Sequence, residues 1–145
     1  MSKSAPHTIA IIGSGATGYT AAKVLRAEGF TGTITMIGSE LAAPYRRPTV
    51  SKELLTGAKS IEQVQLGSPI DGVDVRSGVT AVGVTDSAVL LDEGDPVPYD
   101  ALLLATGSRA RQLDLPGHVF TLRGVADVEP LHADILRTGS LLVIG

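Results

Sequence analysis

Three glycines at fixed spacing, Gly13, Gly15 and Gly18, are the residues best suited to hold a phosphate group. They stand between an apolar, β-branched run at Thr8–Ile12 and residues 16–28, whose apolar spacing predicts an amphipathic helix. In such a loop the glycines permit a tight turn, close approach of a pyrophosphate and close packing of helix on strand, while the helix N-terminus offers free N–H groups. We expect a dinucleotide-binding loop formed by Gly13, Ser14, Gly15, Ala16, Thr17 and Gly18.

A carboxylate after the next predicted strand, Thr33–Ile37, fits the same chemistry. The order of strand, glycine turn, helix and strand is that of a βαβ unit. In dinucleotide folds an acid near the end of the second strand bonds a ribose hydroxyl. Glu40 is the only carboxylate close to that point, so we expect it, with Ser39 beside it, at an adenosine ribose. The alternative for Glu40 is a solvated loop glutamate.

Composition excludes several classes of protein and site. The 145 residues suit one domain with a real core, and the net charge of −3 provides no basic face for nucleic acid. There is no cysteine, which excludes a disulfide scaffold, a thiolate zinc site and a redox dithiol within this chain. The three histidines have no partners at metal-ligand spacing, so no metal site is expected. No apolar run approaches the ~20 residues that span a bilayer, and we expect a cytoplasmic protein.

The remaining elements are short and separated by turn residues. Between residues 73 and 99 the pattern predicts a small antiparallel β-meander, with strands at Val73–Arg76, Val79–Val84, Ala88–Leu91 and Val97–Tyr99. Ala101–Ala105 is a continuous apolar run, which predicts a central strand. A helix is expected from Asp127 to about Arg137, and a final strand opens within residues 140–145.

Three further stretches, taken with the glycine loop, resemble one family. They are Pro44-Tyr-Arg-Arg-Pro-Thr-Val-Ser-Lys-Glu-Leu-Leu55, Tyr99-Asp-Ala-Leu-Leu-Leu-Ala-Thr-Gly-Ser-Arg109 and Phe120-Thr-Leu-Arg123. In this order they are similar to the N-terminal part of the FAD-dependent ferredoxin reductases, the family of putidaredoxin, rhodocoxin and rubredoxin reductases. The resemblance implies an α/β fold: a Rossmann-like FAD-binding lobe with a parallel sheet and a small antiparallel β-meander. Members of the family have two dinucleotide-binding domains, and the resemblance implies that this chain contains that architecture only in part.

The resemblance assigns roles to individual residues. The glycine loop would cradle the FAD pyrophosphate, Arg47 would help to hold the adenosine end, and Lys52 would reach the flavin as the candidate catalytic residue. The family usually has an acid at position 39, which shifts the ribose role onto Glu40. The remaining implied FAD contacts are the backbone of Val79 and Thr80 at adenine, the turn Ala105, Thr106 and Gly107 near the ribityl and phosphate groups, and Arg123. The alternatives for Lys52 and Arg123 are exposed surface cations.

The implied activity is oxidoreduction. A flavoprotein of this family takes hydride from NAD(P)H onto FAD and passes electrons singly to a ferredoxin- or rubredoxin-type acceptor. Residues 1–139 are expected to form the first, incomplete lobe of the FAD-binding domain, and residues 140–145 the first strand of a truncated NAD(P)H-binding domain. The full-length family is enzymatic, while activity of these 145 residues alone stays open. The alternatives are a non-catalytic Rossmann nucleotide-sensing module, which would show regular βα repeats after the second strand, and an inactive truncated remnant.

Overall fold

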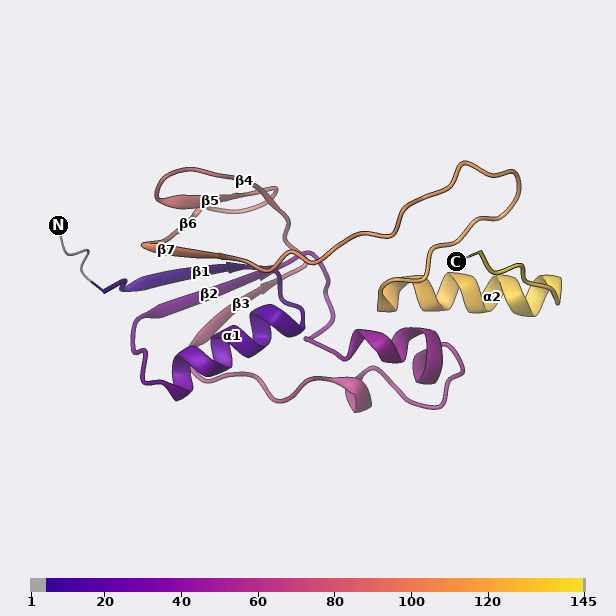
Figure 1. The fold of residues 1–145 in the computed structure, drawn as a ribbon, viewed down its shortest axis with the longest axis horizontal. Helices are drawn as coiled ribbons and strands as arrows, with labels where there is room; N and C mark the ends of the chain where they lie inside the picture. Colours follow the sequence, from indigo (N-terminus) through magenta and orange to yellow (C-terminus); the bar gives the residue numbers. More distant parts are fainter. Residues whose placement is uncertain (1–4, 145) are drawn as a thin grey trace. The chain divides into compact units, whose positions relative to one another are not determined.

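The computed structural model describes residues 5–144 and forms an α/β fold around a four-stranded parallel sheet (Figure 1). The strand order is β3-β2-β1-β7. The strands are β1 (Thr8–Ile12), β2 (Thr33–Gly38), β3 (Val73–Ser77) and β7 (Ala101–Leu104). Helix α1 (Ala16–Ala27) joins β1 to β2, and Gly29, at a φ of +84°, follows its end. The predicted βαβ unit is therefore confirmed, with the glycine loop at the carboxyl end of β1.

A separate antiparallel sheet forms the predicted meander. Its strands, in the order β4-β5-β6, are β4 (Ala81–Val84), β5 (Ala88–Leu91) and β6 (Val97–Pro98). Turn residues between them, including Asp86-Ser87 and Gly94-Asp95, reverse the chain as the sequence predicts.

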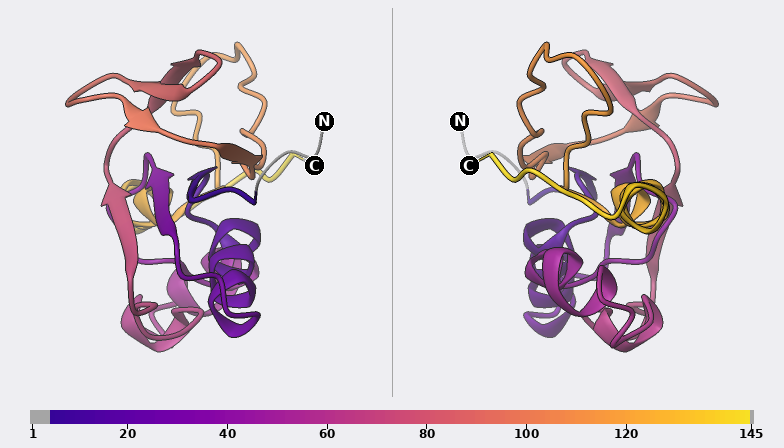
Figure 2. Two further views of the ribbon diagram at one scale, coloured as in Figure 1. Left: turned by 90° about the vertical axis from the view of Figure 1, so that its left-hand side faces the viewer. Right: turned by 90° about the vertical axis from the view of Figure 1, so that its right-hand side faces the viewer.

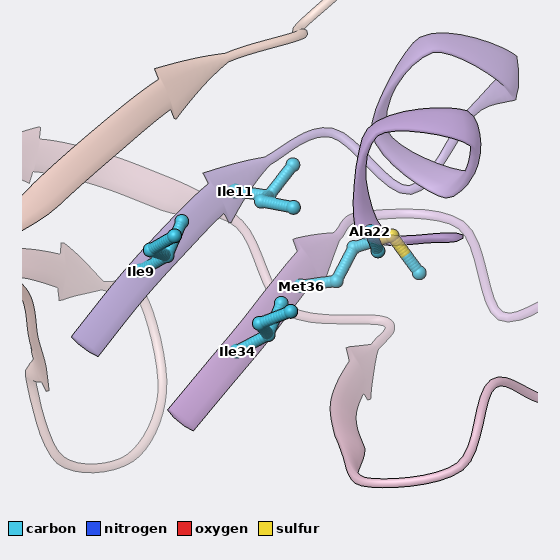
Figure 3. Close-up of a cluster of buried hydrophobic side chains, with 5 residues drawn as sticks. All are labelled: Ile9, Ile11, Ala22, Ile34 and Met36. Carbon is cyan, nitrogen blue, oxygen red and sulfur yellow. The ribbon is translucent and has the colours of Figure 1, made fainter. Parts of the chain in front are cut away.

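The parallel sheet lies between α1 and the small sheet, and each of its faces has its own apolar cluster (Figure 2). On the α1 face, alternate residues of β1 and β2 meet the helix, as Figure 3 shows for Ile9, Ile11, Ala22, Ile34 and Met36. The intervening residues Ala10 and Ile37 face the small sheet and pack with Val89 and Val97. This two-residue alternation explains why both strands are almost wholly apolar: each is covered on both faces.

One strand belongs to a different sheet from the one predicted. The segment predicted as Val73–Arg76 is not part of the meander; it is β3, an edge strand parallel to β2, with Val73 paired to Ile34. Its alternating pattern is typical of a half-exposed strand, and Val75 is 41% exposed. Because an edge strand of a parallel sheet has such a pattern too, alternation alone could not decide the sheet to which it belongs.

The prediction of a central strand at Ala101–Ala105 is also wrong within residues 5–144. There β7 lies at the edge of the sheet, paired with β1 alone, and Leu104 is 66% exposed. A continuous apolar run normally indicates a strand flanked on both sides. Here its side chains are only partly covered.

No strand forms over the described part of the terminal run. Residues 140–144 have neither helix nor strand, and Leu141, Leu142, Val143 and Ile144 are all exposed. A strand requires a partner for its backbone hydrogen bonds, and nothing in residues 5–144 pairs with these residues. Gly145 lies outside the described residues.

The chain divides into two compact units. The first comprises the residues up to Tyr45 together with Leu66–Gly107, which hold both sheets and α1; the second comprises Arg46–Gln65 and the residues from Ser108 onward. The helical elements of the second unit are the 3₁₀ turns η1 (Arg47–Thr49), η3 (Glu62–Val64) and η4 (Val125–Asp127), the π-helical turn η2 (Val50–Leu54), and α2 (Val128–Thr138). Its buried residues are Val50, Leu54, Val64 and Leu131. The helix expected from Asp127 to about Arg137 is present as α2.

Candidate nucleotide-binding site

The first glycine of the loop is required by its backbone. Gly13 has a φ of +114°, and a Cβ at this position would lie closer than 3.0 Å to the carbonyl oxygen of Ala105. Its N–H donates to the carbonyl of Ile37 at 2.7 Å. The loop is thus fixed between the ends of β2 and β7, as the tight-turn role predicts.

The other two glycines have opposite surroundings. A Cβ on Gly18 would lie closer than 3.0 Å to the carbonyl oxygen of Gly13 and 3.2 Å from Ile11 Cγ2, so this glycine allows α1 to pack on β1. Around Gly15 no heavy atom would lie within 4 Å of an added Cβ. The backbone at Gly15 is therefore open to a ligand, which is the arrangement that a pyrophosphate needs.

The N-terminus of α1 completes the loop. The first backbone bond of the helix runs from the N–H of Tyr19 to the carbonyl of Gly15 at 2.9 Å. The N–H groups of Ala16, Thr17 and Gly18 precede it and have no acceptor within the helix. Ala16 and Thr17 are exposed, and the first turn contains no acidic side chain. The positive end of the helix dipole is thus free to attract an anion.

The candidate ribose acid is held in place by a buried tyrosine. Tyr45, 5% exposed, donates its hydroxyl to Glu40 Oε2 at 2.5 Å. Ser39 beside it is exposed, and Ser14 lies over Gly38, where a Cβ would come closer than 3.0 Å to Ser14 Oγ. Glu40 therefore follows a strand end that contacts the glycine loop. Sequence reasoning did not find Tyr45, although it stands five residues after Glu40.

The candidate adenine segment lies directly beside this acid. Gly78 donates its N–H to the carbonyl of Glu40 at 3.2 Å, and Val79 donates to the carbonyl of Gly38 at 3.1 Å. The N–H of Thr80 donates to Asp92 Oδ1 at 2.8 Å. Because both N–H groups of the pair Val79 and Thr80 are engaged within the protein, a base at this segment would be met by carbonyl oxygens. Asp92 is a second residue that sequence reasoning did not find.

The turn after β7 meets the glycine loop as well. Ala105 donates its N–H to the carbonyl of Ile12 at 2.7 Å, and its own carbonyl faces Gly13. Thr106 and Gly107 are exposed, and Gly107 has a φ of +69°. The ends of β1, β2 and β7 thus bring three candidate segments to the carboxyl edge of one parallel sheet. Ligands of open α/β sheets bind at this edge.

The three cationic candidates, Arg47, Lys52 and Arg123, belong to the second unit. A hydrogen bond joins two of them. Arg47 Nη1 donates to the carbonyl of Arg123 at 3.0 Å. The guanidinium of Arg123 donates to the carbonyl and Oγ of Ser108 at 3.2 and 3.1 Å. The backbone N–H of Arg123 donates to Asp127 Oδ2 at 2.7 Å. Lys52 lies in η2 and is exposed. The structure therefore gathers the candidates into two groups, one in each unit.

Two surface hollows are lined by none of these candidates. One, of about 550 Å³, includes Arg26, Phe30 and Thr33 at the amino end of β2, opposite the glycine loop. The other, of about 370 Å³, lies in the second unit and includes Leu113, Phe120 and Pro130. Neither contains a group of titratable side chains, so the sheet edge is the better candidate site. Among residues 5–144 no helix is long and apolar enough to cross a bilayer.

The chain is similar to known proteins over most of its length. Residues 7–145 match the family described as pyridine nucleotide-disulphide oxidoreductase. The chain belongs to this family. These 145 residues contain no cysteine.

Two curated relatives are reductases by name. The ferredoxin reductase component of chlorobenzene dioxygenase from Cupriavidus sp. (strain PS12) is 45% identical over 132 residues, covering 85% of this chain and 32% of the relative. Rhodocoxin reductase from Rhodococcus erythropolis is 38% identical over 149 residues, covering 95% of this chain and 35% of the relative. The chain spans about a third of the length of these relatives.

Solved structures give the same picture. NADH:rubredoxin oxidoreductase from Clostridium acetobutylicum superposes with a TM-score of 0.83 at 26% identity, covering 91% of this chain and 36% of that protein. A chain of the covalent putidaredoxin reductase–putidaredoxin complex superposes with a TM-score of 0.77 at 30% identity, covering 89% and 34%. The α/β fold expected from the sequence resemblance is confirmed.

Proposed function

We propose that this chain is the FAD-binding part of an NAD(P)H-dependent oxidoreductase that delivers electrons to a ferredoxin- or rubredoxin-type acceptor. The observation that supports it most directly is the contrast within the glycine loop: Gly13 and Gly18 are closed in by backbone atoms, whereas Gly15 is open beside the free N–H groups of α1. The names of the relatives support the choice of acceptor, because they include ferredoxin reductase components and a rubredoxin oxidoreductase.

The residues present fit a dinucleotide with two phosphates. Gly15 and the N–H groups of residues 16–18 would hold the pyrophosphate, and Glu40 would accept from a ribose hydroxyl. Carbonyl oxygens near Val79 would face adenine, and Ala105–Gly107 would border the rest of the ligand. In the second unit Arg47, Lys52 and Arg123 would supply positive charge to the same ligand.

Bound FAD would accept two electrons as hydride and release them one at a time, which a one-electron acceptor requires. The side chain proposed to act on it is Lys52, the exposed cation of η2. A cation near a flavin stabilises negative charge on its reduced ring, so Lys52 would tune the flavin toward electron storage.

The NAD(P)H-binding domain, which would begin with residues 140–145, and a cytoplasmic location are parts of the same proposal. So is the assignment of residues 1–139 to an FAD-binding domain. The absence of regular βα repeats after β2 favours this proposal over a nucleotide-sensing module, since β4, β5 and β6 form a meander instead.

Calorimetry with three ligands tests the proposal. The purified chain is titrated in turn with FAD, NADH and ATP, which share the adenosine end and differ in the rest of the molecule. We expect FAD to bind most tightly. A preference for NADH or ATP would favour the sensing module, and no binding of any of the three would indicate a remnant without cofactor.

A further inference from the structure

Asp92 holds both backbone groups of Thr80. It lies in the turn after β5, where Oδ1 accepts from the N–H of Thr80 at 2.8 Å and the Asp92 N–H donates to the carbonyl of Thr80 at 2.9 Å. Oδ1 also accepts from the N–H of Glu93 at 3.0 Å, which fixes the rotation of the carboxylate. A residue in the turn after β5 therefore holds the backbone of a residue that precedes β4.

The segment held in this way is itself bonded to the candidate ribose acid. Gly78 and Val79 donate to the carbonyls of Glu40 and Gly38. A continuous series of direct bonds thus runs from Asp92 through Thr80 and its two preceding residues to the loop after β2. All of these residues belong to the first unit.

The charge state of Asp92 strengthens the contact. Donation from the Thr80 N–H holds the pKa of Asp92 below its ordinary value, so the side chain is a carboxylate at neutral pH. A hydrogen bond to a carboxylate is about twice as strong as one between neutral groups. The side chain is exposed, and its structural effect is therefore confined to the backbone that it bonds.

We propose that Asp92 is a positioning residue for the adenosine end of the bound dinucleotide. By holding Thr80 it fixes Gly78–Thr80 against Glu40 before the ligand arrives, so that binding does not have to order this segment. The inference rests on the proposed function, because it assumes that the ligand's adenosine lies beside Glu40 and Val79. It assigns to the small sheet a part in cofactor affinity as well as in covering the parallel sheet.

ADP is the suitable probe, because it has the adenosine and two phosphates and lacks the flavin. Its dissociation constant is measured by calorimetry for the wild-type chain, Asp92→Ala, Asp92→Asn and the neighbouring control Glu93→Ala. Amide hydrogen exchange at Thr80 is followed in each protein without ligand. The control removes an adjacent exposed carboxylate and so matches the change in charge.

Asp92→Ala should weaken the binding of ADP about tenfold, because the loss of one hydrogen bond to a charged group has an effect of that size. It should also speed the exchange of the Thr80 amide hydrogen. Asp92→Asn keeps an oxygen acceptor and should recover most of the affinity, while Glu93→Ala should bind as the wild type does. The inference is overturned if Asp92→Ala binds ADP within twofold of the wild type, if Glu93→Ala loses as much, or if affinity falls while Thr80 stays protected. A wild-type chain that binds no ADP would instead contradict the proposed function, and the inference with it.

Discussion

At the scale of single residues, Gly15 and Gly18 of the same loop should respond differently to substitution, because the space around Gly18 is closed and that around Gly15 is open. Gly18→Ala should destabilise the chain by about 1–3 kcal/mol, because its Cβ would meet the backbone of Gly13, which cannot move aside as a side chain can. Gly15→Ala should change the free energy of unfolding by no more than about 1 kcal/mol, the scale of an N-cap substitution, because the space there is open. Urea denaturation measures both effects.

For FAD binding, the larger effect is expected from Gly15→Ala, the variant with the smaller effect on stability. Gly15→Ala should lose affinity for FAD while staying folded, since its methyl group would occupy the proposed pyrophosphate position. Equal stability of Gly18→Ala and the wild type would contradict the packing role of Gly18. Unchanged FAD affinity in Gly15→Ala would contradict the phosphate role of Gly15.

A different residue gives a prediction about pH. Asp100 precedes β7, and its Oδ2 accepts from the N–H of His7 at 2.9 Å and from the N–H and Oγ1 of Thr8 at 2.8 and 2.9 Å. The pKa of Asp100 is lowered, first by the His7 N–H and then by the two donors of Thr8. A carboxyl whose pKa is lower in the folded state stabilises the protein above its unfolded pKa, and this contribution is lost as the pH falls through the folded value.

The free energy of unfolding should therefore fall more steeply in the wild type than in Asp100→Asn as the pH decreases from about 5 through the ordinary aspartate range near 4 and below. Denaturant titrations at several pH values measure the two slopes. Parallel slopes would show that the contacts of Asp100 do not favour its charged form.

The sequence could predict the structural need for glycine at positions 13 and 18, because a tight turn and close packing of helix on strand both exclude a side chain. The phosphate role of Gly15 and the ribose role of Glu40 stay predictions. Tyr45 and Asp92 could not be found, because their roles depend on partners, Glu40 and Thr80, that only the folded chain brings to them. Hydrogen bonds to a main-chain N–H leave no pattern in the sequence.

At the scale of elements, the small sheet offers a matched pair of substitutions. Val89 of β5 is fully buried against β1 and β2, whereas Val82 of β4 is 63% exposed. Val89→Ala should cost about 1–3 kcal/mol of stability through lost burial and the cavity left behind. Val82→Ala removes the same atoms and should change stability by less than about 0.5 kcal/mol. Similar losses measured by thermal or urea unfolding would contradict the layer order described for the first unit.

Sequence patterns predicted where strands lie along the chain better than they predicted which strands pair. Strands covered on both faces, such as β1 and β2, were predicted nearly to the residue because their apolar runs have no other explanation. The partner of a strand is a different matter: β3 was assigned to the meander and β7 to a central position. Pairing is decided by contacts distant in sequence, such as Val73 with Ile34, which local periodicity does not encode.

At the scale of the whole molecule, the candidate residues belong to two units. The phosphate and adenosine candidates lie in the first and the cations Arg47, Lys52 and Arg123 in the second. The proposed electron transfer would need more than the third of the relatives' length that this chain spans. The part of the account that this chain can answer by itself is FAD binding.

The direct measurement is a titration of FAD into the purified chain, followed by the flavin absorbance and by the melting temperature of the protein. We predict a saturable change with one FAD per chain and a rise in melting temperature that grows with FAD concentration, because a ligand that binds only the folded state stabilises it. No saturable change up to high micromolar FAD, with an unchanged melting temperature, would contradict the account.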